Sequence, residues 1–440
     1  MKKIFKILLY IIISISILGF LFIFLWTKIP EFKAKKEISD LSKYAEKIED
    51  IKIDDQVEII GLGEATHGNK EFQELKLTLL KKLVKDANVR AFALECDFSE
   101  GMEIDSYVKS GKFQKNPSKI FSFTIYHTNE MNDLINWIKK YNQNHDQKIS
   151  FYGFDMQNPE KSVKLLKDFV KKENIDFDIK SLEILEEDKI SIKDPKMKVL
   201  EENLKKLNGK LDKNTKEKRL IENILSSFPY YKMVGDYVKS SEYRDKKMAE
   251  NISWIKDYEK NSRIMIAGHN GHIGKKEPMY KNMGENLLEK YKKLYFAIGT
   301  DFYKTKVNIK TMQKNQRTIQ KFISADPFAY GAKNYNNSYY LDFSKVKDGD
   351  SKNLLDSKIK MGSLGEGYTW VMKFIPYSYR IENSPKEIFD SMIFVYETSP
   401  IKIIENQKSS WLAKSLFFTF QKFLFQVLYF LDLRLQILFF

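Results

Sequence analysis

The chain has 440 residues, of which 43 % are hydrophobic and 30 % charged, and its formal net charge is +15. This composition suits a globular protein of roughly two to three structural units, and the single cysteine, Cys96, excludes an internal disulfide. The lysines are scattered among glutamates and form no Arg/Lys stripe with interleaved aromatics, which argues against a nucleic-acid partner. A basic surface beside an anionic membrane fits this charge better.

An uncharged apolar run covers residues 7–26, directly after Lys2, Lys3 and Lys6. As a helix these residues rise about 30 Å, which is enough to cross the hydrocarbon core of a bilayer. A cleaved signal peptide is the alternative, but the segment that follows, WTKIP, lacks the small residues of a cleavage site. We predict an N-terminal transmembrane anchor over residues 1–36, with the body of the protein outside the cytoplasm.

Five short apolar runs follow, and each ends in glycine or a charged residue. They cover residues 57–63, 90–95, 149–155, 263–268 and 294–299. Such near-continuous strands alternate with helical segments, so they favour an α/β fold: a mostly parallel sheet with helices on both faces. The charge-dense, helical pattern of residues 161–258 predicts a helical insertion between two parts of this core, residues 37–160 and 259–400. The second part has further predicted strands at residues 339–343 and 392–396.

Residues 401–440 end in a segment rich in Phe and Leu. Ser415, Thr419, Lys422 and Gln426 recur at helical spacing and would form a narrow polar stripe on an apolar helix. We predict an amphipathic helix that lies in the membrane interface. Packing of this helix against the protein body is the alternative.

The carboxyl ends of the five predicted strands carry most of the residues suited to acid–base chemistry. Ligands of parallel α/β sheets gather at this edge. The candidates are Glu64, His67, Glu95, Asp155, His269, Asn270, His272 and Asp301, with Lys76 in the helix that follows the first strand. Three of the five histidines fall in this set, and histidine transfers protons near neutral pH. The other two, His127 and His145, lie in polar stretches, where we expect them to be solvated.

A neutral imidazole at His67 can take a proton from water, while a carboxylate at Glu64 or Glu95 holds its tautomer. Lys76 can hold these carboxylates or stabilise an oxyanion. Structural roles stay open beside these catalytic ones: the carboxylates can cap a helix or a strand end, and Lys76 can be a surface lysine.

Three other kinds of site fit the motifs less well. A metal could draw on the histidine motifs, but there is no HExxH and the spacing is loose. No G-x-S-x-G occurs, which disfavours a serine hydrolase. Gly61 and Gly63 resemble the start of a dinucleotide loop, but Thr66 takes the place of its third glycine and Glu64 would repel phosphate. We therefore predict no metal and no cofactor.

Four blocks of sequence resemble the erythromycin esterase family. They are GEATHG at residues 63–68, ALE at 93–95, GFDMQ at 153–157 and AGHNGHIGK at 267–275. Together with weaker similarities, the resemblance extends over roughly residues 40 to 400. It implies a mostly parallel α/β core with a helical subdomain over a cleft, and hydrolysis of a macrolide lactone without a metal.

The resemblance also implies roles for individual residues. It assigns the general base to His67, the orienting carboxylates to Glu64 and Glu95, and the second histidine pair to His269 and His272. The family's arginine after the base aligns with Lys76, and a lysine cannot form the same bidentate fork.

The sequence therefore predicts an erythromycin esterase-like hydrolase that cleaves an ester or lactone, a reaction that the resemblance links to the response to macrolide antibiotics. We expect Asp155, Asn270 and Asp301 to contact the substrate. The predicted partners are a small-molecule ester or lactone and membrane lipids. Two alternatives stay open: a membrane-tethered protein that binds haem or a metal in the same cleft, and an envelope enzyme that acts on a glycan or lipid ester.

Overall fold

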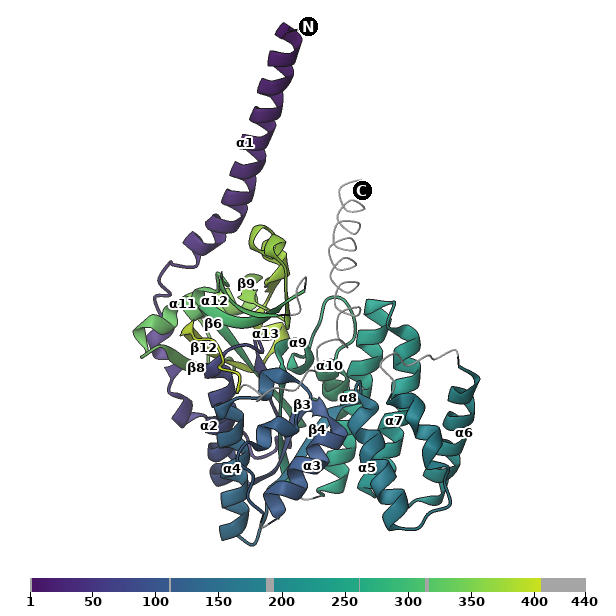
Figure 1. The fold of residues 1–440 in the computed structure, drawn as a ribbon. Coiled ribbons are helices and arrows are strands. Elements are labelled where there is room, and N and C mark those ends of the chain that lie inside the picture. The colour runs from purple at the N-terminus through teal and green to yellow at the C-terminus, as the bar shows by residue number, and fades with distance from the viewer. Residues whose placement is uncertain (1, 111, 187–193, 261, 313–315, 405–440) are drawn as a thin grey trace. The chain divides into compact units, whose positions relative to one another are not determined.

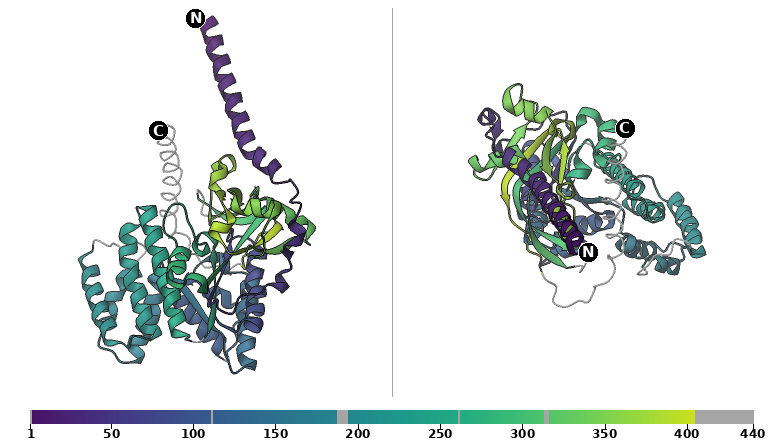
Figure 2. Two further views of the ribbon diagram at one scale, coloured as in Figure 1. Left: turned by 180° about the vertical axis from the view of Figure 1, so that it is seen from behind. Right: turned by 90° about the horizontal axis from the view of Figure 1, so that it is seen from above.

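The computed structural model describes residues 2–110, 112–186, 194–260, 262–312 and 316–404 (Figures 1 and 2). The chain forms two compact units. Unit 1 comprises residues 1–51, 65–69 and 300–400, and unit 2 comprises residues 52–64, 70–299 and 401–440. The C-terminal amphipathic helix predicted within residues 401–440 falls on residues 405–440, which lie outside the described part of the chain.

Unit 2 is built on parallel strands. They are β2 (Ile59–Glu64), β3 (Val89–Asp97), β4 (Ser150–Asp155), β5 (Arg263–His269) and the first residues of β6 (Tyr295–Thr311). Their order is β6-β2-β5-β3-β4, and every neighbouring pair runs parallel. Every residue of β2 and β4 is buried, which explains why these strands read as continuous apolar runs. The predicted mostly parallel α/β core is confirmed.

Helices connect these strands. They are α2 (Lys70–Asp86), α3 (Phe98–Lys109), α4 (Asn129–Asn144), α5 (Pro159–Lys172), α6 (Pro195–Lys210), α7 (Lys216–Met233), α8 (Tyr237–Tyr258), α9 (Asn270–Ile273) and α10 (Met283–Tyr291), with 3-10 turns at Pro117–Ile120, Thr124–Tyr126, Ile179–Leu185 and Lys292–Leu294. The sequence signals are visible in α4, where Thr128 caps the helix by accepting a hydrogen bond from Met131 N at 3.2 Å. The helical segments predicted between the strands thus include α2 and α4.

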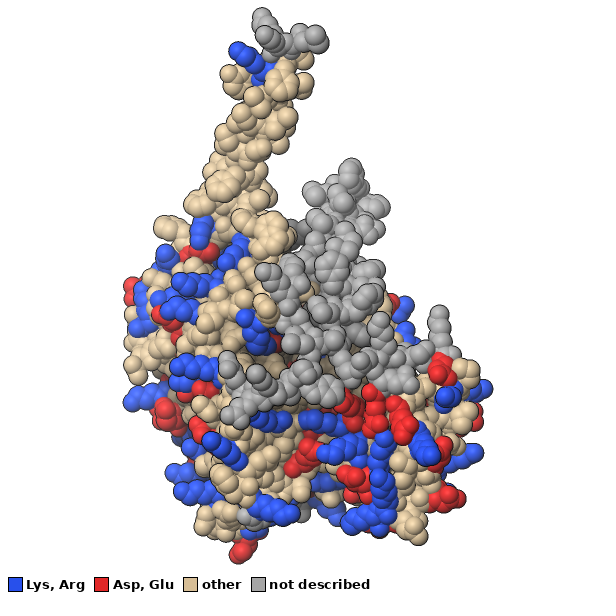
Figure 3. Space-filling view, viewed as in Figure 1, with Lys and Arg blue, Asp and Glu red and all other residues tan. Residues whose placement is uncertain are grey.

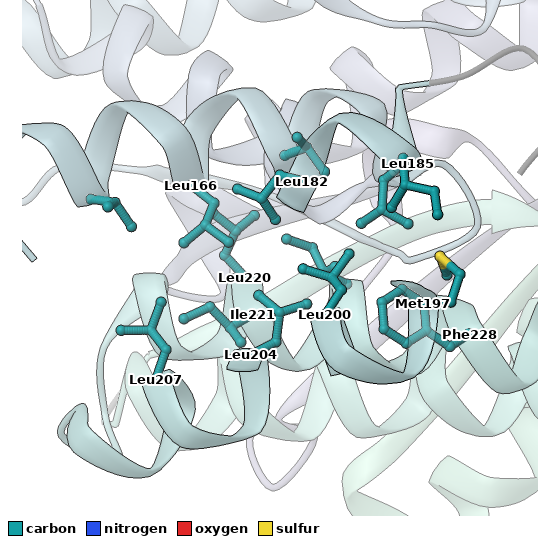
Figure 4. Packing of buried hydrophobic residues seen from close by; sticks show 14 of the residues in the cluster. Leu166, Leu182, Leu185, Met197, Leu200, Leu204, Leu207, Leu220, Ile221 and Phe228 are labelled. Carbon is teal, nitrogen blue, oxygen red and sulfur yellow. The ribbon is translucent and has the colours of Figure 1, made fainter. Parts of the chain in front are cut away.

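The helices between β4 and β5 share a core of their own. Leu200, Leu204 and Leu207 repeat along one face of α6, and each is at most 4 % exposed. Figure 4 shows Leu204 close to Leu220 of α7 and Leu166 of α5, in a cluster that also includes leucines of the Ile179–Leu185 turn. Helices α5 to α8 span the predicted helical insertion of residues 161–258. That this insertion is a separate domain stays a prediction.

Unit 1 contains α1 and mostly antiparallel strands. The strands are β1 (Ala45–Glu46), the remainder of β6, β7 (Arg317–Ile323), β8 (Ser338–Asp342), β9 (Ile359–Gly362), β10 (Gly367–Tyr368), β11 (Arg380–Asn383) and β12 (Ser391–Thr398). The helices are α1 (Lys2–Lys33), α11 (Pro327–Gly331), α12 (Gly349–Asp356) and α13 (Pro385–Ile388), with 3-10 turns η1 (Leu41–Lys43), η2 (Ile48–Asp50), η7 (Ala332–Asn334), η8 (Trp370–Phe374) and η9 (Pro376–Ser378). β8 pairs antiparallel with β1 and β12, and β6 pairs with β7 and β10. The strands predicted at residues 339–343 and 392–396 correspond to β8 and β12.

Helix α1 carries the apolar run near the N-terminus. In the described part of the chain, its residues Ile4–Lys33 form the one helix that is long and apolar enough to cross a membrane, and the most apolar stretch of this helix is not buried against the rest of the protein. Figure 3 shows uncharged residues along its length and Lys or Arg side chains at its two ends. A membrane anchor and a signal sequence both have this form.

Candidate active site

Glu64 and Lys76 form a buried ion pair in unit 2. Glu64 is the last residue of β2, Lys76 lies in α2, and their side chains are 3 % and 1 % exposed. Lys76 Nζ donates to Glu64 Oε2 and lies 3.4 Å from the carbonyl oxygen of Phe72. Because a buried charge without a partner is strongly unfavourable, each side chain depends on the other. Lys76 is therefore not a surface lysine.

Arg244 of α8 joins the ends of β3 and β4. Its Nη2 lies 2.9 Å from Glu95 Oε1 and 2.7 Å from Asp155 Oδ2, and its Nε lies 3.1 Å from Asp155 Oδ1. The side chains of Arg244, Glu95 and Asp155 are 12 %, 7 % and 1 % exposed. The planar guanidinium contacts both carboxylates at once, which a lysine ammonium could not do with the same geometry. The carboxyl ends of two neighbouring strands are thus held by one cation from the helical segment.

His272 of α9 lies between two carboxylates. Its Nδ1 is 2.9 Å from Asp245 Oδ2, and its Nε2 is 3.3 Å from Glu95 Oε1. Burial alone would lower the pKa of His272, but the carboxylates of Asp245 and Glu95 raise this pKa to about 10. Asp245, fully buried, also accepts a hydrogen bond from Met283 N at 2.9 Å, which fixes its carboxylate. His272 is therefore an imidazolium at neutral pH.

One contact opposes this charge. Arg244 Nη1 lies 3.2 Å from His272 Nε2, and a guanidinium N–H can donate only to an unprotonated ring nitrogen. That contact alone would favour a neutral ring. Attraction by a carboxylate at each ring nitrogen outweighs one hydrogen bond from a guanidinium whose other N–H groups are directed at Glu95 and Asp155. The imidazolium is the form that the surroundings favour.

His269 and Asn270 form the junction of β5 and α9. His269 Nδ1 accepts a hydrogen bond from Gly271 N at 3.2 Å and caps α9, and its backbone N–H donates to Glu95 Oε2 at 2.8 Å. Asn270 lies close to β2, because a Cβ on Gly63 would lie only 2.2 Å from Asn270 Oδ1. The glycine of the first motif thus allows the second motif to approach β2. Glu64 lies at the carboxyl end of β2 and Glu95 near the carboxyl end of β3. Both lie in the same region of unit 2, because β5 pairs with both strands.

Two predicted residues belong to unit 1. His67 lies in the segment of residues 65–69 and is half-buried. Asp301 is fully buried in β6, where its carboxyl oxygens accept hydrogen bonds from Gly362 N at 2.9 and 3.0 Å. Burial and the adjacent carboxylate of Asp326 hold the pKa of Asp301 well above its usual range, so the two side chains share a proton. The structure therefore brings together Glu64 with Lys76, and Glu95 with Asp155 and the second histidine motif, and places Asp301 in a separate carboxyl pair.

Sequence reasoning missed Arg244 and Asp245. The available signal was weak: Arg244 and Arg219 are the only arginines among the many lysines of residues 161–258. His127 was also interpreted wrongly, because it is 9 % exposed and its Nε2 lies 2.7 Å from the carbonyl oxygen of Phe121. Burial lowers its pKa. His145 is exposed, as expected, and stacks on Tyr141.

The chain contains the residue types that bind metals, but the described residues do not place them around a common point. In the described ranges, no group of three or more His, Cys, Asp or Glu side chains is arranged to hold a metal ion. The buried carboxylates of the cluster instead contact Lys76, Arg244 and His272.

A family model provides the wider context for this cluster. The model of the erythromycin esterase family matches residues 84–398, which is most of the chain. The chain belongs to the erythromycin esterase family. This membership confirms the resemblance that the four sequence blocks indicated.

Individual members and solved structures are more distant. Erythromycin esterase type II of Escherichia coli is 31 % identical over 105 residues, which is 24 % of this chain and 25 % of that protein. YbfO of Bacillus subtilis strain 168, whose name describes it as a hydrolase, is 24 % identical over 292 residues, 56 % of this chain and 65 % of that protein. The chain thus spans a quarter and just under two thirds of these two relatives.

Crystal structures with the same fold cover most of the chain. A succinoglycan biosynthesis protein has a TM-score of 0.69 at 21 % identity, over 85 % of this chain and 99 % of that one. A mutant of the erythromycin esterase EreC in its open conformation has a TM-score of 0.59 at 16 % identity, over 80 % of this chain and 93 % of that one. At these identities the likeness establishes the fold alone.

Proposed function

We propose that the protein is a hydrolase that cleaves a carboxylic ester or lactone, with macrolide lactones as the first substrate class to test. The observation that carries this proposal is the buried cluster of Glu64, Lys76, Glu95, Arg244 and His272 in unit 2. A buried ion-pair cluster of this kind gives little stability beyond what apolar side chains of similar size would give, and such clusters are typical of catalytic sites. Membership of the erythromycin esterase family and the names of the two relatives support the reaction class.

In this proposal His67 is the general base. Its assignment rests on the GEATHG motif, in which it follows Glu64 by three residues. His272 is a poor candidate for that role, because a group with a pKa of about 10 is already protonated near neutral pH. The neutral imidazole of His67 would take a proton from water while the water oxygen attacks the carbonyl carbon. The tetrahedral oxyanion then collapses, the C–O bond breaks, and the leaving oxygen takes the proton back from His67.

The buried cluster of unit 2 supplies fixed charge within that unit. His272 offers a cation that persists over the neutral range, suited to an oxyanion. Lys76 donates to Glu64 and holds its side chain in place, and Arg244 does the same for Glu95 and Asp155. In the proposal Asp155 and Asn270 keep their predicted role as substrate contacts. Asp301 does not, because it is fully buried in unit 1, where it accepts from Gly362 N and shares a proton with Asp326.

We further propose that α1 anchors the protein in the cell membrane, with its body outside the cytoplasm. The uncharged run of residues 7–26 and the absence of a cleavage motif after it support an uncleaved helix. An anchored enzyme would meet lipid or glycan esters of the envelope, which makes these esters the second substrate class.

Mass-spectrometric screening of macrolides and envelope esters tests the proposal. The purified full chain is compared with His67→Ala and with His145→Ala, a matched control because His145 is exposed and stacks on Tyr141. Hydrolysis should add one water to the substrate, persist in the presence of a chelator, disappear in His67→Ala and remain in His145→Ala. Wild-type turnover by His67→Ala would remove the base from the mechanism. A haem absorbance band or stoichiometric metal, without hydrolysis, would favour a binding protein instead.

A further inference from the structure

An exposed aromatic pair lies in unit 1, in the 3-10 turn η8 that follows β10. Trp370 is 65 % exposed and Phe374 is 44 % exposed. Their ring centroids are 5.9 Å apart, so they form one continuous apolar surface. In the described part of the chain beyond α1, few other large hydrophobic side chains are exposed. Of these, Tyr258 stacks on Trp254, but Trp254 is half-buried, so the two rings do not form an exposed pair. A clustered, exposed aromatic surface indicates contact with a partner.

The turn that carries this pair is well packed. The rings of Tyr368 and Tyr379, on either side of the turn, lie 6.0 and 4.9 Å from the ring of Phe322 in β7. Between them Met372 is 4 % exposed, and Ser378 Oγ donates to its carbonyl oxygen at 3.2 Å. The backbone is thus fixed by buried neighbours. The exposure of Trp370 and Phe374 is therefore a consequence of the fold.

The same segment contacts α1 where its apolar run ends. The rings of Tyr377 and Trp26 are 5.3 Å apart. Arg380, whose side chain is 1 % exposed, donates to the carbonyl oxygen of Thr27 at 3.2 Å and to Glu31 Oε1 at 2.9 Å. These bonds set the position of α1 along its axis relative to the turn. Figures 1 and 2 show the yellow-green segment that follows β10 on the side of unit 1 from which α1 leaves.

The length of α1 places this contact relative to a membrane. A helix over residues 7–26 rises about 30 Å, so Trp26 would lie at the membrane–water boundary, where Trp and Tyr are enriched. Tyr377, packed on Trp26, would lie at the same depth. Lys373, exposed between the two aromatic residues of η8, adds a positive charge that suits anionic headgroups.

We propose that η8 is a membrane-interface element: Trp370 and Phe374 insert into the headgroup region of the bilayer that α1 spans, and they hold unit 1 against the membrane surface. This inference rests on the proposed anchoring by α1. Unit 1 then contacts the bilayer at two places, helix α1 and the aromatic turn η8. Two contacts restrict the tilt of the unit relative to the membrane, whereas α1 alone would leave this tilt free. An ester dissolved in the membrane would then meet unit 1 in a restricted orientation.

Tryptophan quenching in vesicles tests the proposal on the full chain. The protein is reconstituted in phosphatidylcholine–phosphatidylglycerol vesicles, either unmodified or with lipids brominated near the headgroup end of the acyl chain. The fluorescence of Trp370→Phe is subtracted from that of the wild type, which isolates the signal of Trp370. Trp26→Phe gives the signal of the anchor in the same way. Trp254→Phe is the control, because Trp254 packs on Phe98 in unit 2.

The three difference signals separate the outcomes. The proposal expects brominated lipid to remove most of the Trp370 signal and most of the Trp26 signal, and to leave the Trp254 signal unchanged. If the Trp26 signal is quenched and the Trp370 signal is not, the anchor stands and the interface role of η8 is overturned, which leaves the aromatic pair to a protein partner. If neither signal is quenched, the anchor itself fails and the inference fails with it.

Discussion

Removal of the Arg244 side chain should destabilise unit 2 strongly. Arg244→Met leaves the carboxylates of Glu95 and Asp155, 7 % and 1 % exposed, without the cation that lies 2.9 and 2.7 Å from them. Breaking a buried pair by deleting one partner costs about 3–5 kcal/mol, because the other charge stays buried and uncompensated. Arg244 has two such partners, so we expect the upper part of this range. In a domain of this size each kcal/mol lowers the Tm by about 2–4 °C, which gives a decrease on the order of 10 °C.

Thermal unfolding of the full chain in detergent measures this effect, with Arg219→Met as the matched control. Arg219 of α7 is 14 % exposed, similar to Arg244, but its ion-pair partner Glu222 is 33 % exposed and stays solvated when the arginine is removed. Its Nε also donates to Asn251 Oδ1 at 2.7 Å, and that buried oxygen keeps a hydrogen bond from Asn223 Nδ2 when the arginine is removed. The control should lose only about 1 kcal/mol.

Neutralising the carboxylates tests the physical reason. In Arg244→Met combined with Glu95→Gln and Asp155→Asn, no buried charge is left unpaired at this position, so part of the lost stability should return. The reasoning is refuted if Arg244→Met costs no more than Arg219→Met, or if the combined variant unfolds at a still lower temperature than Arg244→Met alone.

Three further predictions concern the same region. Lys76→Met should lower the free energy of unfolding in urea by about 3–5 kcal/mol, because both side chains of the pair are at most 3 % exposed. Adding Glu64→Gln to Lys76→Met should restore part of this loss, and equal stability of the single and the double variant would contradict the prediction. Gly63→Ala places a Cβ 2.2 Å from Asn270 Oδ1, at the start of α9, so turnover should fall by about a hundredfold. In the control Gly209→Ala the new Cβ has no atom within 4 Å, so turnover should stay at the wild-type value. The pKa of His272, about 10, lies above that of an unfolded histidine, about 6.5. Its stabilisation is therefore complete below about pH 6.5 and lost as the pH rises towards 10; unfolding measured over this range should be flatter in His272→Gln, and an equal slope would show that the ring is neutral.

The strands of unit 2, and the acidic residues at their carboxyl ends, could be predicted because the sequence pattern that marks a buried strand lies within the strand itself. A strand buried on both faces must be apolar along its whole length, so residues 57–63 and 149–155 are recognisable without any knowledge of their neighbours. The rule that parallel strands present their carboxyl ends at one edge then places Glu64, Glu95 and Asp155. No homologue is needed for this step.

The partners of those residues could not be predicted in the same way. Arg244 is separated from Glu95 by 149 residues and from Asp155 by 89 residues along the chain. Its helix has the charge-rich pattern of a solvent-exposed segment, and apart from being one of two arginines in residues 161–258 it has no local feature that distinguishes it from the lysines around it. His127 failed for the related reason that a polar neighbourhood in sequence says nothing of tertiary burial. Pairs between distant elements require the fold.

The charge balance of the cluster gives a physical reason for the unusual state of His272. Lys76 compensates Glu64, which leaves the carboxylates of Glu95, Asp155 and Asp245 with Arg244 as their cation. Among these side chains alone, a neutral His272 would leave two negative charges in excess in a buried region, and an imidazolium leaves one. Repulsion between buried carboxylates is reduced by the second cation, so the protonated ring is favoured by the whole group as well as by its two contacts. Asp245→Asn should therefore lower the pKa of His272 even though its side chain keeps nearly the same shape, and NMR titration of the ring would measure the change.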